Sequence, residues 1–319
     1  MLFILYIIKP QESNIMSKSI SSNWVMIPIS TKDSRKKIRI ELTPVYKGVL
    51  NRQVHFLIGP RLNIYLARLK SDLPPIILSV LCMVIGFLFI IIQLYYQLRY
   101  HEKTHNLIYL GVFLLSIGLW KITDTQFSPL LFPENTVVLG YITLAILFVA
   151  EVPLMLFVKG QLQNKLTVLL DISCFISILV AAVVALLQIM GISDLRENIL
   201  LSHMLIFLAI FSITVSILYH WKKENLDHNT KISFLFFLLC VVGAGMDLVC
   251  FYLKGSSSGI FFMIIAVLVY TIFLGIYNIQ SINRKAYTDI HTGLFNRSRC
   301  NEILSSMKSI QSPTGFIML

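Results

Sequence analysis

The stretch that decides the fold is Leu166–Met190, LTVLLDISCFISILVAAVVALLQIM, in which Asp171 is the one charged residue in a run dominated by apolar side chains. A helix needs about 20 such residues to cross the hydrocarbon of a bilayer. Hydrophobic residues make up 56% of the chain and charged residues only 13%, whereas soluble domains carry about 25% charged residues. The sequence therefore predicts an α-helical integral membrane protein.

Six further apolar runs of spanning length accompany this one along the 319 residues. Because each run can cross the bilayer once, we predict a seven-transmembrane bundle over residues 73–280. A retinal-binding pump is excluded, because the last run has no lysine for a Schiff base. The seven runs are Pro75–Tyr95, Asn106–Ile122, Thr136–Val158, Leu166–Met190, Ile199–Tyr219, Ile232–Leu253 and Gly259–Ile279.

Loop charge indicates how these runs are oriented, because Lys and Arg in short loops favour the cytoplasmic side. Nine basic residues lie in the loops on one side of the predicted bundle and three on the other. We therefore expect the N-terminus outside and the C-terminus in the cytoplasm. The nine are Arg99, Lys103, Lys159, Lys165, Lys222, Lys223, Lys231, Arg284 and Lys285, and the three are Lys121, Arg196 and Lys254.

The net charge of +11 does not indicate nucleic-acid binding, because twelve of the 27 Lys and Arg residues precede the first run. Most of the others flank membrane ends, where anionic lipid headgroups attract them, so the expected partner is the lipid bilayer. The five cysteines are scattered and include no CxxC pair, so we predict neither a disulfide nor a metal site. They are Cys82, Cys174, Cys240, Cys250 and Cys300.

Residues 1–72 carry alternating apolar and polar side chains of the kind found in half-buried strands. Candidate strands are Val25–Ile29, Lys37–Leu42 and Val54–Ile58. Three strands rarely bury enough apolar surface to fold alone. We expect an extracytoplasmic β-rich segment that is part of a β-sandwich.

Six ionisable side chains lie inside the predicted spans or directly at their ends, and such a side chain costs about 2.5–3.5 kcal/mol at the bilayer centre. One hypothesis makes the outer four a ligand or proton site and the inner two a relay that senses helix movement. The alternative is structural: a Lys121–Asp124 or Lys121–Asp247 ion pair, with the remaining acids bonded across helices. The outer four are Lys121, Asp124, His203 and Asp247, and the inner two are Glu151 and Asp171.

After the last span the chain reads Thr288-Asp289-Ile290-His291-Thr292-Gly293-Leu294-Phe295-Asn296-Arg297. This string resembles the opening of a GGDEF domain, the catalytic module of diguanylate cyclases, and departs from the family pattern at His291, where the family has Leu. The resemblance implies turn-forming and helix-capping roles and no catalytic role for the matched residues. These are Asp289, Thr292, Gly293, Leu294, Asn296 and Arg297.

The same resemblance implies a helix over Ser298–Ile310 and a strand over Gly315–Leu319, so residues 281–319 are expected to be a signalling helix and the first part of a GGDEF domain. In the family, Mg²⁺ and GTP bind to residues that follow this strand. We therefore expect a chain truncated before its active site, and shortened at its front as well, that makes no cyclic di-GMP and needs no cofactor.

The whole arrangement is similar to bacterial seven-transmembrane receptors with diverse intracellular signalling modules, with weak support from the strings Trp24–Ile29 and Lys37–Leu42. That resemblance implies an inner-membrane receptor for an unknown extracellular ligand. Heptad-like spacing after the last span predicts a homodimer. Two alternatives stay open, a catalytically silent membrane signalling partner and a transporter. The spaced residues are Ile272, Gly275, Ile279, Ile282 and Ala286.

Overall fold

A computed structural model describes residues 26–29, 57–100, 105–162, 167–223, 228–254, 262–287 and 294–307. These residues contain no β-strand. Residues 26–29 have no regular structure, and neither do Leu57 and Ile58. The predicted strand Lys37–Leu42 and the predicted strand Gly315–Leu319 lie outside the described residues. The β-sandwich therefore stays a prediction, while the helical part of the predicted fold class is confirmed.

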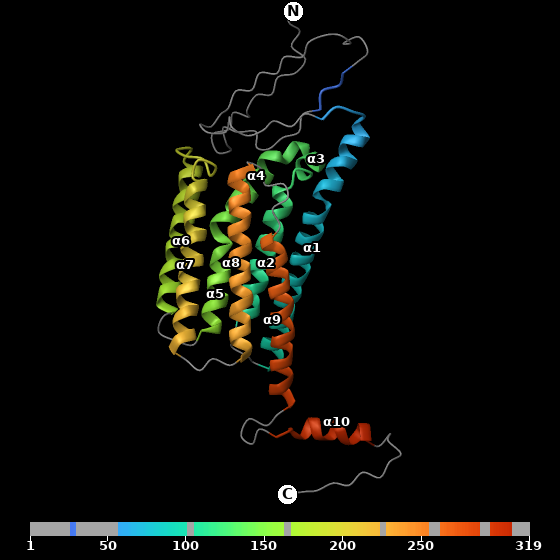
Figure 1. Cartoon of the computed structure of the whole chain (residues 1–319), viewed down its shortest axis with the longest axis vertical. Coiled ribbons are helices and arrows are strands. Elements are labelled where there is room, and N and C mark those ends of the chain that lie inside the picture. The colour runs from blue at the N-terminus through green and yellow to red at the C-terminus, as the bar shows by residue number, and fades with distance from the viewer. Residues whose placement is uncertain are drawn as a thin grey trace, which may run out of the picture.

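The described chain is a bundle of lengthwise helices with one further helix below it (Figure 1). Its upper end is the end where α1 begins, and its lower end is where α9 leaves the bundle. The helices are α1 (Arg61–Tyr100), α2 (Asn106–Asp124), α3 (Ser128–Leu131), η3 (Pro133–Asn135), α4 (Thr136–Val149), α5 (Glu151–Gln161), α6 (Thr167–Ile189), α7 (Ile199–Lys223), α8 (His228–Lys254), α9 (Phe262–Tyr287) and α10 (Arg297–Met307).

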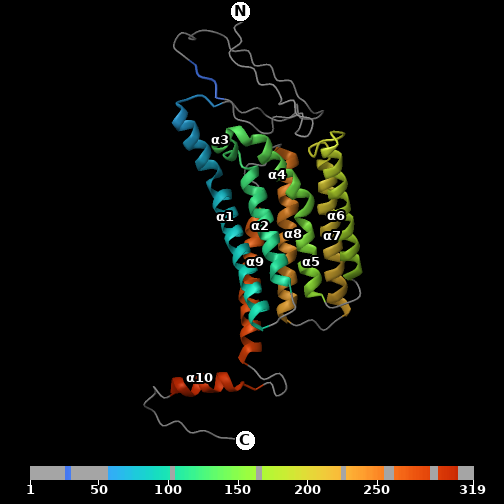
Figure 2. The ribbon, with the colours of Figure 1, turned by 180° about the vertical axis from the view of Figure 1, so that it is seen from behind.

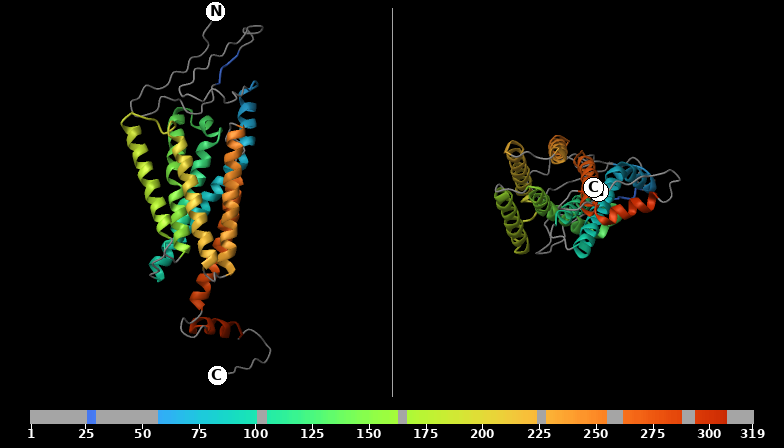
Figure 3. Two further views of the ribbon diagram at one scale, coloured as in Figure 1. Left: turned by 60° about the vertical axis from the view of Figure 1, so that its left-hand side comes forward. Right: turned by 90° about the horizontal axis from the view of Figure 1, so that it is seen from below.

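Five segments of the described chain are long and apolar enough to cross a membrane: Arg61–Arg99, Asn106–Asp124, Pro133–Gln161, Thr167–Ile189 and Ile199–Lys222. The helices α8 and α9 are 27 and 26 residues long. Their described apolar parts are shorter, Phe237–Asp247 and Phe262–Leu274. The views from behind and from below show both of these helices in the bundle with the others (Figures 2 and 3).

On α6 polar side chains face the interior of the bundle and apolar side chains face outward, the opposite of an amphipathic helix in a soluble protein. Its buried face carries Ser173 and Ser177, whereas Phe175 and Ile178 on the opposite face are 67% and 55% exposed. In water such a face would be an extended apolar patch of the kind that marks contact with a membrane or a partner. Hydrocarbon around the bundle accounts for this pattern, which supports a membrane-spanning protein.

The predicted third span, Thr136–Val158, is interrupted at Ala150, where α4 ends and α5 begins. Pro153 has no N–H and cannot donate to the carbonyl of Val149, four residues earlier, so one helical hydrogen bond is missing at this point. The interruption makes Glu151 the first residue of α5 and leaves it buried within the bundle.

The first helix begins well before the predicted boundary at residues 72 and 73. Its residues Pro74 and Pro75 lie inside an otherwise continuous α1. The Ser79 hydroxyl donates to the carbonyl oxygen of Pro75 at 2.6 Å. Asp72, which is buried, accepts a hydrogen bond from the Phe127 N–H at 2.8 Å and so fixes α1 to the connection that follows α2.

The backbones of α1 and α2 lie in close contact at glycine residues. A Cβ atom on Gly86 would lie 2.7 Å from the carbonyl oxygen of Gly111, and one on Gly111 would lie 2.6 Å from the carbonyl oxygen of Gly86. A Cβ on Gly118 would lie 2.7 Å from the carbonyl oxygen of Ser79. Small residues of this kind let membrane helices pack at short distance.

We predict that Gly111→Ala separates α1 from α2, because the added methyl group meets backbone atoms that cannot rotate away. The expected loss is about 1–3 kcal/mol of unfolding free energy, the usual cost of overpacking. The measurement is detergent-induced unfolding of the purified protein, followed by circular dichroism. Gly245→Ala on α8 is the matched control, because nothing lies within 4 Å of the added atom. Equal stability of the two variants would contradict the close contact.

Candidate intramembrane polar site

Near the upper end of the bundle, Lys121 and Asp124 form an ion pair one turn apart on α2. The Lys121 Nζ lies 3.5 Å from Asp124 Oδ2, and the two side chains are 3% and 22% exposed. The same Nζ lies 5.6 Å from the centre of the Trp120 ring. A buried ammonium group needs such partners, because an isolated charge is costly to remove from water.

Asp247 on α8 caps the start of α9 from the neighbouring helix. Its Oδ1 accepts a hydrogen bond from the Phe262 N–H at 3.2 Å, and its Oδ2 accepts one from the Met263 N–H at 2.9 Å. These are the first two residues of α9, whose N–H groups have no acceptor within the helix. Negative charge is favourable at this position.

Lys121 also has a favourable electrostatic interaction with the Asp247 carboxylate. The structure thus brings together three of the four predicted outer residues, Lys121, Asp124 and Asp247, from α2 and α8. We call these three residues the upper cluster. The fourth, His203, lies on α7 and is partly exposed.

The two predicted inner residues are not paired with each other. Asp171 receives a hydrogen bond from Lys159 Nζ at 2.6 Å, and their side chains are 47% and 38% exposed. An ion pair with this much exposure contributes about 0–1 kcal/mol in water. Glu151 on α5, in contrast, is 6% exposed, and neither of its carboxylate oxygens makes a hydrogen bond among the described residues.

Five buried polar residues on α6 and α7 were not predicted as a site. They follow each other at four-residue intervals, which places them along one face of each helix. Ser173 Oγ and Ser212 Oγ join the two rows at 2.6 Å. The signal was present in the sequence, since serine recurring every four residues in an apolar helix marks a polar stripe. The five are Ser173, Ser177, Ser212, Ser216 and His220, and all are at most 1% exposed.

The motif Thr288–Arg297 is described only from Leu294 onward. Asn296 Oδ1 accepts a hydrogen bond from the Arg299 N–H at 3.0 Å, which caps the start of α10. Arg297 is the first residue of that helix, and the Leu294 side chain is 70% exposed. Asp289, Thr292 and Gly293 lie outside the described residues. The predicted helix Ser298–Ile310 corresponds to α10, Arg297–Met307.

Metal chemistry has no support from the described side chains. Within the ranges that the structure describes, no three histidine, cysteine, aspartate or glutamate side chains are grouped so that they could hold a metal ion.

No family model matches this chain, and no curated protein or solved structure matches it either.

We predict that Asp247→Leu destabilises the bundle by about 2–3 kcal/mol, because it leaves two N–H groups of α9 without acceptors and removes a charge-assisted interaction. Asp247→Asn keeps one acceptor oxygen and should lose less. The measurement is the detergent concentration at the midpoint of unfolding. Asp171→Asn serves as the control and should change stability by less than about 1 kcal/mol, as expected for an exposed pair. A fully stable Asp247→Leu variant would contradict the capping role.

Proposed function

We propose that this protein is a bacterial inner-membrane sensor of the diguanylate cyclase lineage. In this proposal a seven-helix bundle responds to an extracellular stimulus and passes the response through α9 to a cytoplasmic output domain. The alternatives of a catalytically silent signalling partner and a transporter are outcomes of the tests below.

The observation that carries the proposal is the position of the GGDEF-like motif relative to α9. The helix continues without interruption from Phe262 to Tyr287, and the motif begins at the next residue, Thr288. The first helix after the motif, α10, begins at Arg297 with Asn296 as its cap. A continuous helix that leads into this turn is the connection that the cyclase family uses.

Loop charge gives independent support for the orientation. The nine-to-three distribution of Lys and Arg assigns the lower end of the bundle to the cytoplasm. If α8 and α9 are the sixth and seventh spans, the motif is on the side where GTP is present. The structure has five spans by length and composition in its described part, so the last two belong to the proposal.

We predict that a fluorescent reporter fused after Arg284 is active, because that position faces the cytoplasm in the proposed orientation. A periplasmic phosphatase fused after Asn198, between α6 and α7, should also be active. Exchanging the two reporters should abolish both signals, as measured in whole cells with expression checked by immunoblot. Phosphatase activity at Arg284 would mean that the number of spans is wrong by one.

We predict that a complete GGDEF domain, joined so that its own turn coincides with Thr288–Arg297, makes cyclic di-GMP when fused to this bundle. The measurement is mass spectrometry of the product formed from GTP and Mg²⁺ in purified membranes. One residue inserted after Ile282 should lower the rate severalfold, because it rotates each domain by about 100°. A four-residue insertion, close to a full turn, should recover part of the rate.

The inactive control for this experiment is the same graft with its own metal-binding aspartate changed to asparagine. Equal rates for all insertion lengths would show that α9 does not fix the orientation of the two domains. The bundle would then be an anchor, and the receptor function would lose its support.

A further inference from the structure

We propose that Glu151 is a proton-binding site in the interior of the bundle, reached from the lower end along a column of hydroxyl groups that ends at His220. The polar column is defined as Ser177 and Ser173 on α6 together with Ser212, Ser216 and His220 on α7. This site is separate from the upper cluster and from the cytoplasmic motif.

The surroundings of the Glu151 carboxyl group disfavour its ionised form. The Glu151 side chain is only 6% exposed. Both of its carboxyl oxygens are shielded from solvent and make no hydrogen bond among the described residues. An ionised carboxylate in an apolar interior is strongly destabilised unless it is paired. No ion pair in the described part of the chain includes Glu151.

Ser177 is the polar group of α6 that interacts with this carboxyl group. Its hydroxyl is also shielded and makes no hydrogen bond within the described residues. A protonated carboxyl group has one O–H donor and a free acceptor oxygen, and a serine hydroxyl complements both. One carboxyl group and one hydroxyl are too few oxygens for a metal cation, which takes six or more when it is Ca²⁺ or Mg²⁺, and this favours a proton.

Ser173 lies one turn below Ser177 on α6, and from there the side chains of the column make hydrogen bonds to one another or to backbone carbonyl oxygens. The Ser173 hydroxyl donates to the carbonyl oxygen of Leu169 at 2.9 Å, so the Ser212 hydroxyl donates to Ser173 Oγ at 2.6 Å. The Ser216 hydroxyl donates to the carbonyl oxygen of Ser212 at 2.8 Å.

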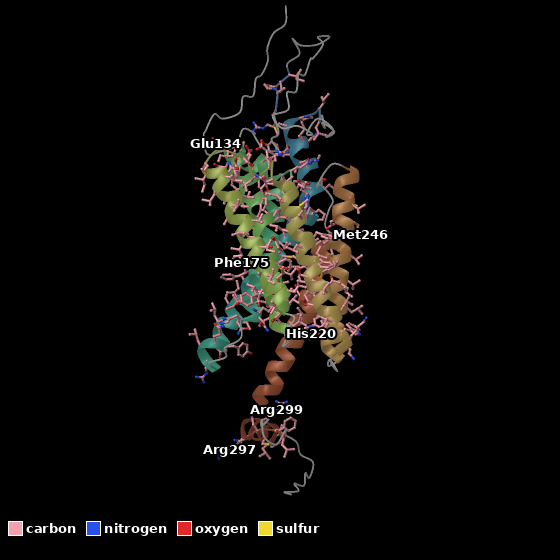
Figure 4. The ribbon with its side chains drawn as sticks, turned by 90° about the vertical axis from the view of Figure 1, so that its left-hand side faces the viewer. Glu134, Phe175, His220, Met246, Arg297 and Arg299 are labelled. Carbon is pink, nitrogen blue, oxygen red and sulfur yellow. The ribbon has the colours of Figure 1, made fainter. Side chains whose placement is uncertain are left out.

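His220 ends the column near the last residue of α7, Lys223. Its Nδ1 donates to the carbonyl oxygen of Ser216 at 2.7 Å, because a carbonyl can only accept. Its Nε2 is shielded and has no hydrogen-bond partner among the described residues. This nitrogen can therefore accept or release a proton. In Figure 4 His220 lies in the lower part of the bundle, below Phe175.

The other titratable groups on the helices packed against α5 interact with other partners or only electrostatically with Glu151. On the helices packed against α5, Cys174 of α6 interacts electrostatically with Glu151 and with the Lys159–Asp171 pair. On α2, Lys121 pairs with Asp124, and the Tyr109 ring lies 6.4 Å from that of His105. On α4, the Tyr141 hydroxyl donates to Asp194 Oδ1 at 3.4 Å. On α7, besides His220, His203 and Tyr219 have interactions of their own.

The test is infrared difference spectroscopy of the purified full chain in lipid nanodiscs, titrated from about pH 5 to about pH 8, where histidines and perturbed groups change charge. The wild type should show a protonated-carboxyl band that loses intensity as the pH rises. Glu151→Gln, which keeps the shape, should lack this band. Asp171→Asn should retain it, and Ser177→Ala should shift its frequency, because the interacting hydroxyl is gone.

A band that persists in Glu151→Gln, or that does not change with pH, would overturn the proposal, because the carboxyl group would then be elsewhere or permanently bonded. Replacing choline chloride with sodium chloride at constant ionic strength distinguishes a bound proton from a bound Na⁺. If sodium displaces the titration, the site holds Na⁺ and the proton assignment is wrong.

Deuterium exchange of the same band tests the route. His220→Leu should slow the exchange by about tenfold or more, which corresponds to about 1.4 kcal/mol added to the barrier. His203→Leu, on the same helix but nearer its upper end, is the matched control and should exchange at the wild-type rate. Equal rates for the two variants would overturn the column as the route to Glu151.

Discussion

Hydrocarbon around the bundle removes the usual reason for helices to associate, because lipid tails are as apolar as the interior. Helix contact then depends on close backbone approach and on polar side chains that need partners. The Gly86–Gly111 contact supplies the first between α1 and α2. The Ser173–Ser212 hydrogen bond and the Asp247 cap of α9 supply the second.

Polar groups inside the bundle fall into two regions that differ in how completely they are satisfied. In the upper cluster each residue has a partner, since Lys121 interacts with both acids and Asp247 receives two backbone N–H groups. The region around Glu151 differs, because the carboxyl group, the Ser177 hydroxyl and His220 Nε2 make no hydrogen bond within the part of the chain that the structure describes. Satisfied networks stabilise a fold. Unsatisfied buried groups point to a ligand or a proton.

Composition and apolar length predicted the membrane class and the helices, because hydrocarbon allows few alternatives for the backbone. The interruption at Ala150 has a sequence signal of its own, the missing N–H of Pro153. Ionisable residues were identified as candidates, yet their pairing was left open. Charge alone could not separate the Lys121–Asp124 pair from the unpaired Glu151, because pairing depends on which helices become neighbours.

The serines of the polar column were missed for a different reason. Serine is common in membrane helices as a donor to its own backbone, so one serine carries little information. Their significance appears only when α6 and α7 pack so that Ser173 and Ser212 meet. A four-residue period of small polar residues on consecutive predicted spans is the sequence feature that identifies such a column in advance.

The helix that carries Glu151, α5, contacts α9 through aromatic side chains. Phe157 follows Glu151 on α5, and its ring meets that of Tyr270 on α9 edge-on at 6.4 Å. Phe237 of α8 meets the same Tyr270 ring at 6.3 Å. A bound proton can bias α9 only by as much as it favours one arrangement of these rings over another. Because α9 is continuous to Tyr287, a shift of Tyr270 would act on the same helix that ends directly before the motif.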